Sequence, residues 1–291
     1  MPKLTCEISQ SLHDALVARR QQTGETTSHI VMAALAEALQ IEHSTLFQVS
    51  TTGALVEGVT QGAITVGKLI QHGDFGIGTF ADFDGEMVVL DGRAYHVTPD
   101  GVSVAAETAQ VPFAVVTHFA PEREAGFEAI ASLDDLLGCL DGLRNTGNEF
   151  FAVRIDGVFG YVKTRAVCKS EGPVALVDAA LTQAEFEFHN VEGVLVGFWS
   201  PPYAKTVNVA GWHLHFLTAD RRGGGHLLAC AAAELRAQFQ HLADFHMAIP
   251  ETAAFLKADL TRDPSGALER AEKDGAHLGG SLHTICADLQ T

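Results

Sequence analysis

The first forty residues combine two patterns of hydrophobic and polar positions. Leu4, Cys6 and Ile8 occupy every second position between polar side chains, and this period of two predicts a short strand. The serines that follow favour the start of a helix. Apolar residues then recur at helical spacing, first over 12–17 and again over 30–39. The opening segment is therefore predicted to be a strand followed by two helices.

This strand–helix–helix order resembles the ribbon-helix-helix module, which implies an intertwined dimer whose strands can enter the major groove of DNA. The positions that face away from the apolar side are Lys3, Thr5 and Glu7, and a glutamate repels phosphate. Residues 1–44 carry three basic and five acidic side chains, a formal charge of about −2. This charge favours a dimerisation arm over a DNA reader. An ordinary helical appendage packed on the rest of the chain is a third interpretation.

After these helices the pattern changes to short hydrophobic runs separated by glycine. Asp-Gly pairs between apolar runs, as in LDGR (90–93) and RIDG (154–157), predict hairpin turns. Helical spacing predicts two further helices, over 64–71 and 132–143. The stretch EFEFHNVEGVLVGFW (185–199) alternates and then becomes continuously apolar. We therefore expect neighbouring strands of a barrel or sandwich in this half.

Three histidines lie at a spacing that suits a metal. His213 and His215 in WHLHF are two positions apart in a predicted strand, so both side chains point to one face and can converge on one ion. Turn-forming residues at 220–225 follow, and a hairpin there returns His226 to the pair. Three histidine ligands leave positions open for water or substrate, which is typical of catalytic zinc. The alternative is that the pair faces a polar cavity and His226 is a turn residue.

Composition narrows the class of partner. The 291-residue chain has a formal charge of −17 at pH 7, which argues against nucleic acid as a partner. A small anionic substrate then needs a local cation, either a metal or a buried arginine. No apolar stretch approaches the roughly 20 residues that cross a membrane, and no secretory leader is recognisable. The five scattered cysteines indicate reduced thiols of a cytoplasmic protein.

Seven motifs follow one another between about residues 45 and 260: VSTTGALVEGVTQG (49–62), HGDFGIGTF (72–80), DGE (84–86), VKTR (162–165), FEFHNVEGVLVGFWSPPYA (186–204), HLHF (213–216) and DRRGGGH (220–226). In this order and spacing they resemble the alpha-acetolactate decarboxylase family. The resemblance implies an α/β (α+β) protein, commonly a homodimer, with a mixed-sheet domain (45–165) and an antiparallel, barrel-like metal-binding domain (166–260). The arm (1–44) precedes these domains, and a tail (261–291) follows them.

The resemblance also implies a set of site residues and a reaction. The family's zinc ligands correspond to His213, His215 and His226 in this chain. Its active-site glutamate corresponds to Glu86, and its arginine to Arg165. The implied substrate is 2-acetolactate, which is converted to acetoin and carbon dioxide, and the implied cofactor is zinc.

The chemistry of this reaction agrees with those residue types. Loss of carbon dioxide leaves an electron pair that the neighbouring ketone accepts as an enediolate, whose charge zinc can stabilise. Arg165 can hold the carboxylate by paired hydrogen bonds. Glu86 or an acid from the tail can protonate the enediolate. The tail acid is expected at Glu272, with Glu269 and Asp274 as alternatives.

Two other functions use the same features. A metabolite-responsive regulator would bind DNA through the N-terminal segment and sense a ligand in a decarboxylase-like body. A zinc hydrolase would use the same three histidines to activate water. The complete set of histidines, glutamate and arginine favours the decarboxylase.

Overall fold

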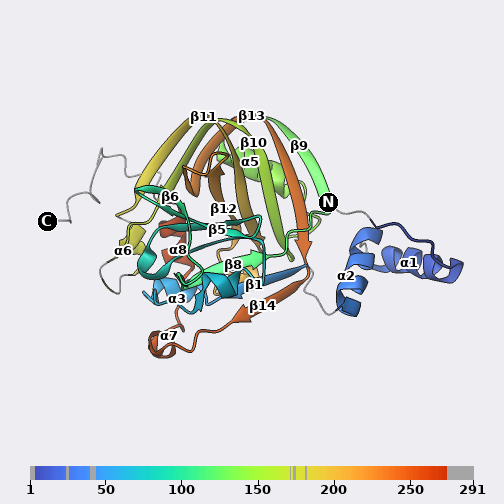
Figure 1. Ribbon diagram of the computed structural model, residues 1–291, viewed down its shortest axis with the longest axis horizontal. Coiled ribbons are helices and arrows are strands. Elements are labelled where there is room, and N and C mark those ends of the chain that lie inside the picture. The colour runs from blue at the N-terminus through green and yellow to red at the C-terminus, as the bar shows by residue number, and fades with distance from the viewer. Residues whose placement is uncertain are drawn as a thin grey trace. The chain divides into compact units, whose positions relative to one another are not determined.

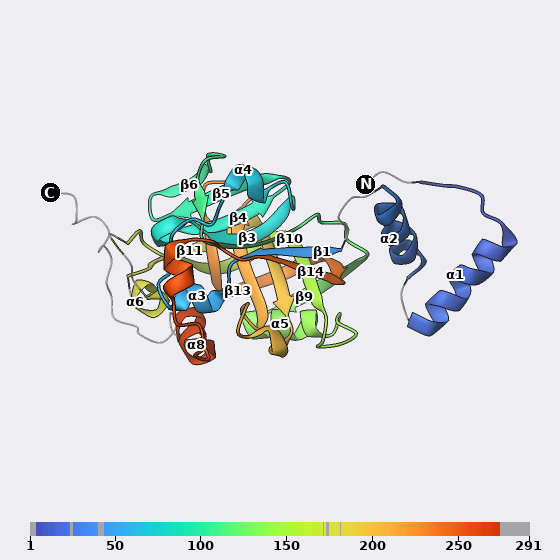
Figure 2. The same cartoon turned by 90° about the horizontal axis from the view of Figure 1, so that it is seen from below.

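Contacts divide the chain into two units, residues 1–43 and 44–291. The computed structural model describes residues 4–23, 26–39, 44–170, 172, 175–180 and 182–273. Figure 1 and Figure 2 show the elements of both units from two directions. Among the described residues, no helix combines the length and the apolar character needed to span a membrane.

The N-terminal unit contains two helices, α1 (Gln10–Thr23) and α2 (Thr27–Leu39), so both predicted helices are confirmed. The predicted strand is not formed, because residues 4–9 have no regular secondary structure. A strand needs a neighbour for its backbone N–H and C=O groups, and the described residues of this unit contain no other strand. Of those residues only Ala36 is buried.

The second unit, called the body here, consists mainly of β-structure. Its strands are β1 (Thr45–Val49), β2 (Ile64–Thr65), β3 (Phe75–Thr79), β4 (Glu86–Leu90), β5 (Arg93–Thr98), β6 (Gly101–Val104), β7 (Gln110–Val111), β8 (Phe113–Thr117), β9 (Arg123–Ile130), β10 (Phe150–Ala166), β11 (Ala184–Ser200), β12 (Gly211–Thr218), β13 (Gly224–Leu242) and β14 (Asp244–Ala248). Its helices are α3 (Thr52–Val56), α4 (Val66–Leu69), α5 (Leu133–Asp141), α6 (Leu176–Ala180), α7 (Ala253–Lys257) and α8 (Ser265–Lys273), with short 3₁₀ turns η1 (Ala81–Phe83) and η2 (Pro202–Ala204).

Most strands of the body belong to two large sheets. The first has the order β14-β1-β8-β3-β4-β5-β6 and is mixed, because β1 and β14 are parallel and the other neighbours are antiparallel. The second is antiparallel with the order β10-β11-β12-β13-β9, and β13 also pairs with β10. Hydrogen bonding among β10, β11, β12 and β13 therefore returns to its starting strand. In Figure 1 the long strands β10, β11 and β13 arch over the first sheet.

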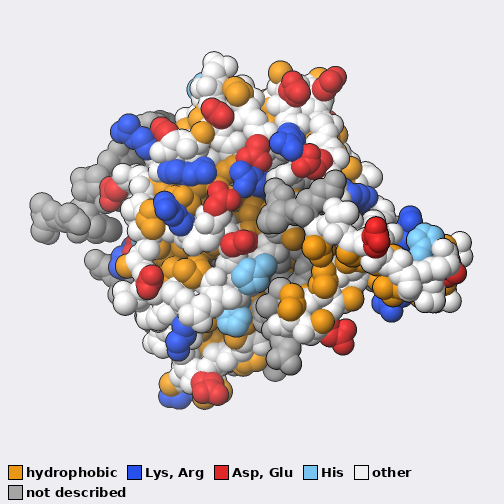
Figure 3. All heavy atoms as spheres, turned by 45° about the vertical axis from the view of Figure 1, so that its right-hand side comes forward, with side chains coloured by type: hydrophobic (Ala, Val, Ile, Leu, Met, Phe, Trp, Pro, Cys, Tyr) orange, Lys and Arg blue, Asp and Glu red, His pale blue; other side chains and the backbone are white. Residues whose placement is uncertain are grey.

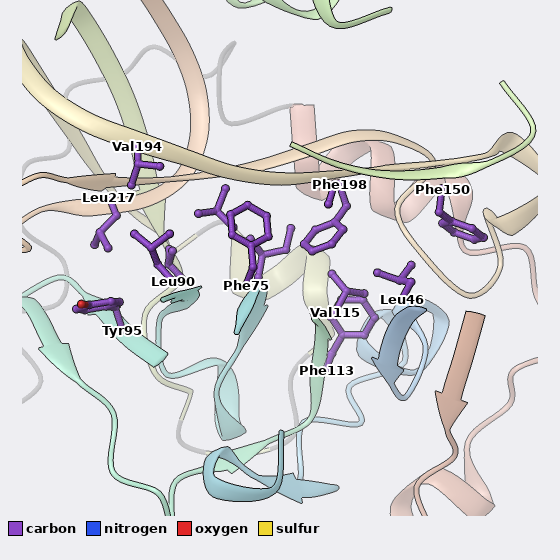
Figure 4. Close-up of a cluster of buried hydrophobic side chains, with 14 of the residues drawn as sticks. Leu46, Phe75, Leu90, Tyr95, Phe113, Val115, Phe150, Val194, Phe198 and Leu217 are labelled. Atoms are coloured by element: carbon purple, nitrogen blue, oxygen red, sulfur yellow. The ribbon is translucent and has the colours of Figure 1, made fainter. Parts of the chain in front are cut away.

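Apolar side chains fill the space between the two sheets. Figure 4 shows Phe75 and Val115 of the first sheet beside Val194 and Phe198 of β11, all in one buried cluster. A second cluster lies on the other face of the antiparallel sheet, where it includes Leu136 of α5. Both faces of the long strands are thus covered, which explains their continuous hydrophobic runs.

Local predictions for the body had mixed outcomes. The predicted helix over 132–143 is confirmed as α5, and the hydroxyl of Ser132 caps it by accepting from the Asp135 N–H at 3.1 Å. The predicted helix over 64–71 shortens to α4, because its first two residues form β2. Asp91-Gly92 forms the β4–β5 hairpin with two positive φ angles, as predicted.

The turn predicted at RIDG (154–157) is wrong, because Gly157 lies inside the continuous strand β10. A Cβ at Gly157 would lie 2.6 Å from a methyl carbon of Leu235 on β13. The pairing of β10 and β13 also shifts register just after this glycine. The glycine therefore serves a close approach of two strands and a bulge instead of a turn.

Two further expectations change. The boundary predicted at 165/166 falls inside β10, and β9 and β14 each join the sheet of the other predicted domain. Each large sheet therefore contains at least one strand from the segment that was predicted to form the other domain. Cys168 is disulfide-bonded, so the prediction of free thiols is wrong for this residue, whereas Cys6, Cys139 and Cys230 are free. Cysteine content therefore no longer supports a cytoplasmic location.

Candidate metal centre

The three histidines come together through one hairpin. His213 and His215 lie on β12, His226 lies near the start of β13, and His215 is the direct cross-strand partner of His226. The connecting turn is closed by Thr218, whose hydroxyl donates to Asp220 Oδ1 at 2.7 Å and accepts from the Gly223 N–H at 3.0 Å. The period-two spacing and the turn residues thus produce the arrangement that the sequence predicted.

The ring nitrogens converge on one point. His213 Nε2 lies 3.1 Å from His226 Nδ1 and 3.2 Å from His215 Nε2. Two nitrogens that each bind one tetrahedral ion at 2.0–2.1 Å are themselves about 3.3 Å apart. The three ligand atoms lie within 4.8 Å of one another. Donor type and spacing therefore fit a single metal ion held by three imidazoles.

The protonation state of two of the histidines, His213 and His226, suits metal binding. Burial lowers the pKa of His213 to about 3, and the positive charge of Arg165 acts in the same direction. Burial also lowers the pKa of His226 well below its ordinary value, with further contributions from Arg165, His213 and His215. Neutral imidazoles keep the lone pairs that coordinate a metal.

The backbone of β4 fixes the orientation of His215. Its Nδ1–H donates to the Met87 carbonyl oxygen at 2.9 Å, which leaves Nε2 facing the other histidines. This is the usual outer-shell arrangement of a metal-bound histidine. His215 Nε2 also lies 3.7 Å from Glu86 Oε2. The glutamate of the DGE motif, at the start of β4, therefore reaches the histidine cluster.

Glu86 is 7% exposed and follows a tightly held turn. Gly85 has φ +79°, and a Cβ there would collide with the Val97 carbonyl oxygen. The hydroxyl of Thr79 donates to the Gly85 carbonyl oxygen at 2.8 Å, and His96 Nε2 donates to the Asp84 carbonyl oxygen. These contacts direct the Glu86 side chain toward the histidines and explain the glycine.

Arg165 reaches the same region from the end of β10, where it is the cross-strand partner of His226. It is 4% exposed. Its guanidinium group donates to Gln183 Oε1 at 3.0 Å and to the Ala271 carbonyl oxygen of α8. A buried cation therefore lies beside the histidine cluster in a chain of strongly negative net charge.

The acid expected from the C-terminal segment is less defined. Glu269 and Glu272 lie on α8, but their side chains are outside the described part of the structure, and Asp274 is outside the described residues. The helix itself is placed at the site by Leu268 and Ala271, which are both buried.

A cavity of about 50 Å³ lies among these groups. Its wall includes the three histidines, Glu86 and Arg165, together with residues that sequence reasoning missed: Thr52, Leu55, Gly78, Thr79, Phe83, Phe113, Val167, Leu176, Val209 and Leu268. Some of these lie in the recognised motifs, where their apolar or small side chains resemble ordinary core residues. No local signal distinguishes them as cavity residues.

Comparison with known proteins decides the family. The model of the alpha-acetolactate decarboxylase family matches residues 46–262. The chain belongs to this family. The resemblance inferred from the motifs is confirmed, and the N-terminal unit lies outside the matched range.

Individual relatives agree with this assignment. The alpha-acetolactate decarboxylase of Methanosarcina mazei is 43% identical over 231 residues, which cover 78% of this chain and 80% of that protein. The enzyme of the same name from Methylococcus capsulatus is 40% identical, with 79% and 90% covered. The crystal structure of alpha-acetolactate decarboxylase from Bacillus subtilis strain 168 has a TM-score of 0.76 at 33% identity, covering 79% of this chain and 99% of that one.

Proposed function

We propose that this chain decarboxylates 2-acetolactate to acetoin and carbon dioxide, with zinc held by His213, His215 and His226. The observation that carries the proposal is the convergence of three histidines beside Glu86 and Arg165 in a member of the alpha-acetolactate decarboxylase family. A zinc ion supplies Lewis-acid stabilisation for the negative charge that develops as carbon dioxide leaves.

Arg165 binds and orients the carboxylate that is lost. The net charge of the chain is −17, and acidic and basic side chains are interspersed on the face that Figure 3 shows. An anionic substrate therefore needs a specific cation, which the buried guanidinium of Arg165 supplies, and a guanidinium can pair with a carboxylate through two N–H groups. Its contact with the Ala271 carbonyl oxygen also ties α8 to the cavity, so the same residue links substrate binding to closure from solvent.

Glu86 holds the proton that replaces carbon dioxide. Its carboxyl group lies 3.7 Å from His215 Nε2 and is shielded from solvent, so it is close to where charge develops. A positioned acid at this place delivers a proton to one face of the reacting carbon, which makes the product chiral. Glu272 is a second candidate for a proton-transfer role.

The test is metal analysis of the purified protein combined with an acetoin assay on racemic acetolactate. We expect close to one zinc per chain, loss of acetoin formation after treatment with a chelator, and recovery on addition of zinc. Full activity of a metal-free preparation would contradict the proposal. Ester hydrolysis without acetoin formation would instead support the zinc hydrolase.

A further inference from the structure

Thr52 carries a buried hydroxyl group without a structural task. The residue is 1% exposed, and its Oγ1 has no hydrogen-bond partner among the described residues. Most buried hydroxyl groups in proteins are hydrogen-bonded, because leaving water without a new partner is unfavourable. An orphaned hydroxyl of this kind therefore requires an explanation.

Its neighbour Thr51 shows what a threonine does when its role is structural. The Oγ1 of Thr51 accepts from the Ala54 N–H at 3.1 Å and caps α3. The backbone N–H of Thr52 is also satisfied, since it donates to the Val207 carbonyl oxygen at 3.1 Å. The start of the helix is therefore complete without the side chain of Thr52.

The surroundings of Thr52 suggest a partner. Thr52 belongs to the wall of the cavity that contains the three histidines, Glu86 and Arg165. The same wall contains the apolar side chains of Leu55, on the same helix, and Leu268 of α8. A substrate with several oxygen atoms needs several polar partners, and the hydroxyl of Thr52 is a polar group of this wall that no described residue engages.

We infer that Thr52 is a specificity-determining residue whose hydroxyl hydrogen-bonds to an oxygen of the bound substrate. This inference rests on the proposed function, because it assigns the hydroxyl to the same oxygen-rich substrate. It explains why a buried polar atom is retained at a position where valine would have the same shape.

The test compares Thr52→Val with two matched variants by steady-state kinetics and thermal melting. Thr52→Val removes the hydroxyl and should lower kcat/KM about tenfold, mainly through KM. Its melting temperature should not fall, because no hydrogen bond is lost in the free protein. Thr52→Ser keeps the hydroxyl and should remain within about threefold of the wild type.

Thr117→Val is the second matched variant. Thr117 is 0% exposed and also has an unpartnered hydroxyl among the described residues, but it is not part of the cavity wall. Its kinetics should stay within about twofold of the wild type. The inference is overturned if Thr52→Val keeps the wild-type KM, if Thr117→Val loses activity equally, or if the effect is confined to the melting temperature. Absence of acetoin formation by the wild type would instead refute the proposed function.

Discussion

The N-terminal unit and the body bury their apolar residues to very different extents. In the N-terminal unit Leu4 is 74% exposed and Leu39 is 66% exposed, and Ala36 alone is buried among the described residues. In the body, strands such as β3, β4 and β8 are buried along their whole length. A segment this short buries too little apolar surface to be stable as an independent folded domain.

This difference separates the two units by role. The body holds its histidines on paired strands between packed layers, which is how a fold positions chemical groups accurately. The N-terminal unit presents apolar side chains that need another surface. We therefore expect substitutions at the site in the body to lower catalytic activity, and substitutions in the N-terminal unit to alter only the self-association of the chain.

The largest effect should follow from loss of a metal ligand. His215→Ala removes a buried imidazole and should abolish stoichiometric zinc binding, with a loss of activity on the order of 1,000-fold. Elemental analysis and acetoin assays measure both quantities. His189→Ala is the control, because His189 is an exposed histidine on β11 outside the cluster. Full zinc content in His215→Ala would refute the ligand assignment.

The next effect concerns the proposed proton donor. Glu86→Gln keeps the shape of the side chain but cannot transfer the proton, so kcat should fall roughly 100-fold. Zinc content should be unchanged, which separates this variant from the ligand variant. Equal losses of zinc and activity would show that Glu86 acts through the metal site and not as the acid.

A smaller effect tests the turn that carries Glu86. Gly85→Ala places a Cβ against the Val97 carbonyl oxygen at φ +79° and should lower both activity, by about tenfold, and stability, by about 2 kcal/mol. Gly92→Ala is matched in φ at +74° but meets no atom within 4 Å. It should lower stability by about 1 kcal/mol and leave activity unchanged. Identical kinetics of the two variants would argue against a positioning role for the turn.

These sites also differ in how far the sequence could predict them. The histidines were accessible from spacing, because period two and a glycine-rich turn together bring His226 to the pair. Glu86 and Arg165 gave no local signal, since a glutamate after glycine and an arginine in a strand are common on surfaces. Only their motifs pointed to the site, and their burial is visible only in the structure.

Long-range pairing was out of reach for another reason. Thr45 pairs with Asp244 in the parallel β1–β14 ladder, and no local pattern encodes so distant a contact. Asp156-Gly157 shows the opposite case, in which a local pattern predicts a turn that does not form. The dipeptide is a strong turn signal by itself, but packing against Leu235 kept the strand continuous. Tertiary contacts therefore decided where local preference was ambiguous.

The smallest effect on activity should come from deletion of residues 1–43. Acetoin formation should stay within about twofold of the full chain, because the family match and every described cavity residue lie beyond this segment.

We propose that the N-terminal unit joins two copies of the chain, so analytical ultracentrifugation should detect weaker self-association after the deletion. Leu4→Glu should reproduce this result in the full chain, because it replaces an apolar side chain that is 74% exposed with a charged one. Thr5→Glu is the control, because it adds the same charge at a neighbouring exposed position that is already polar. Steeply salt-dependent binding of DNA by the full chain, and none by 44–291, would instead favour the regulator. Unchanged self-association after the deletion and in Leu4→Glu would show that the N-terminal unit is an ordinary appendage. A large loss of activity on deletion would show that the N-terminal unit also contributes to catalysis.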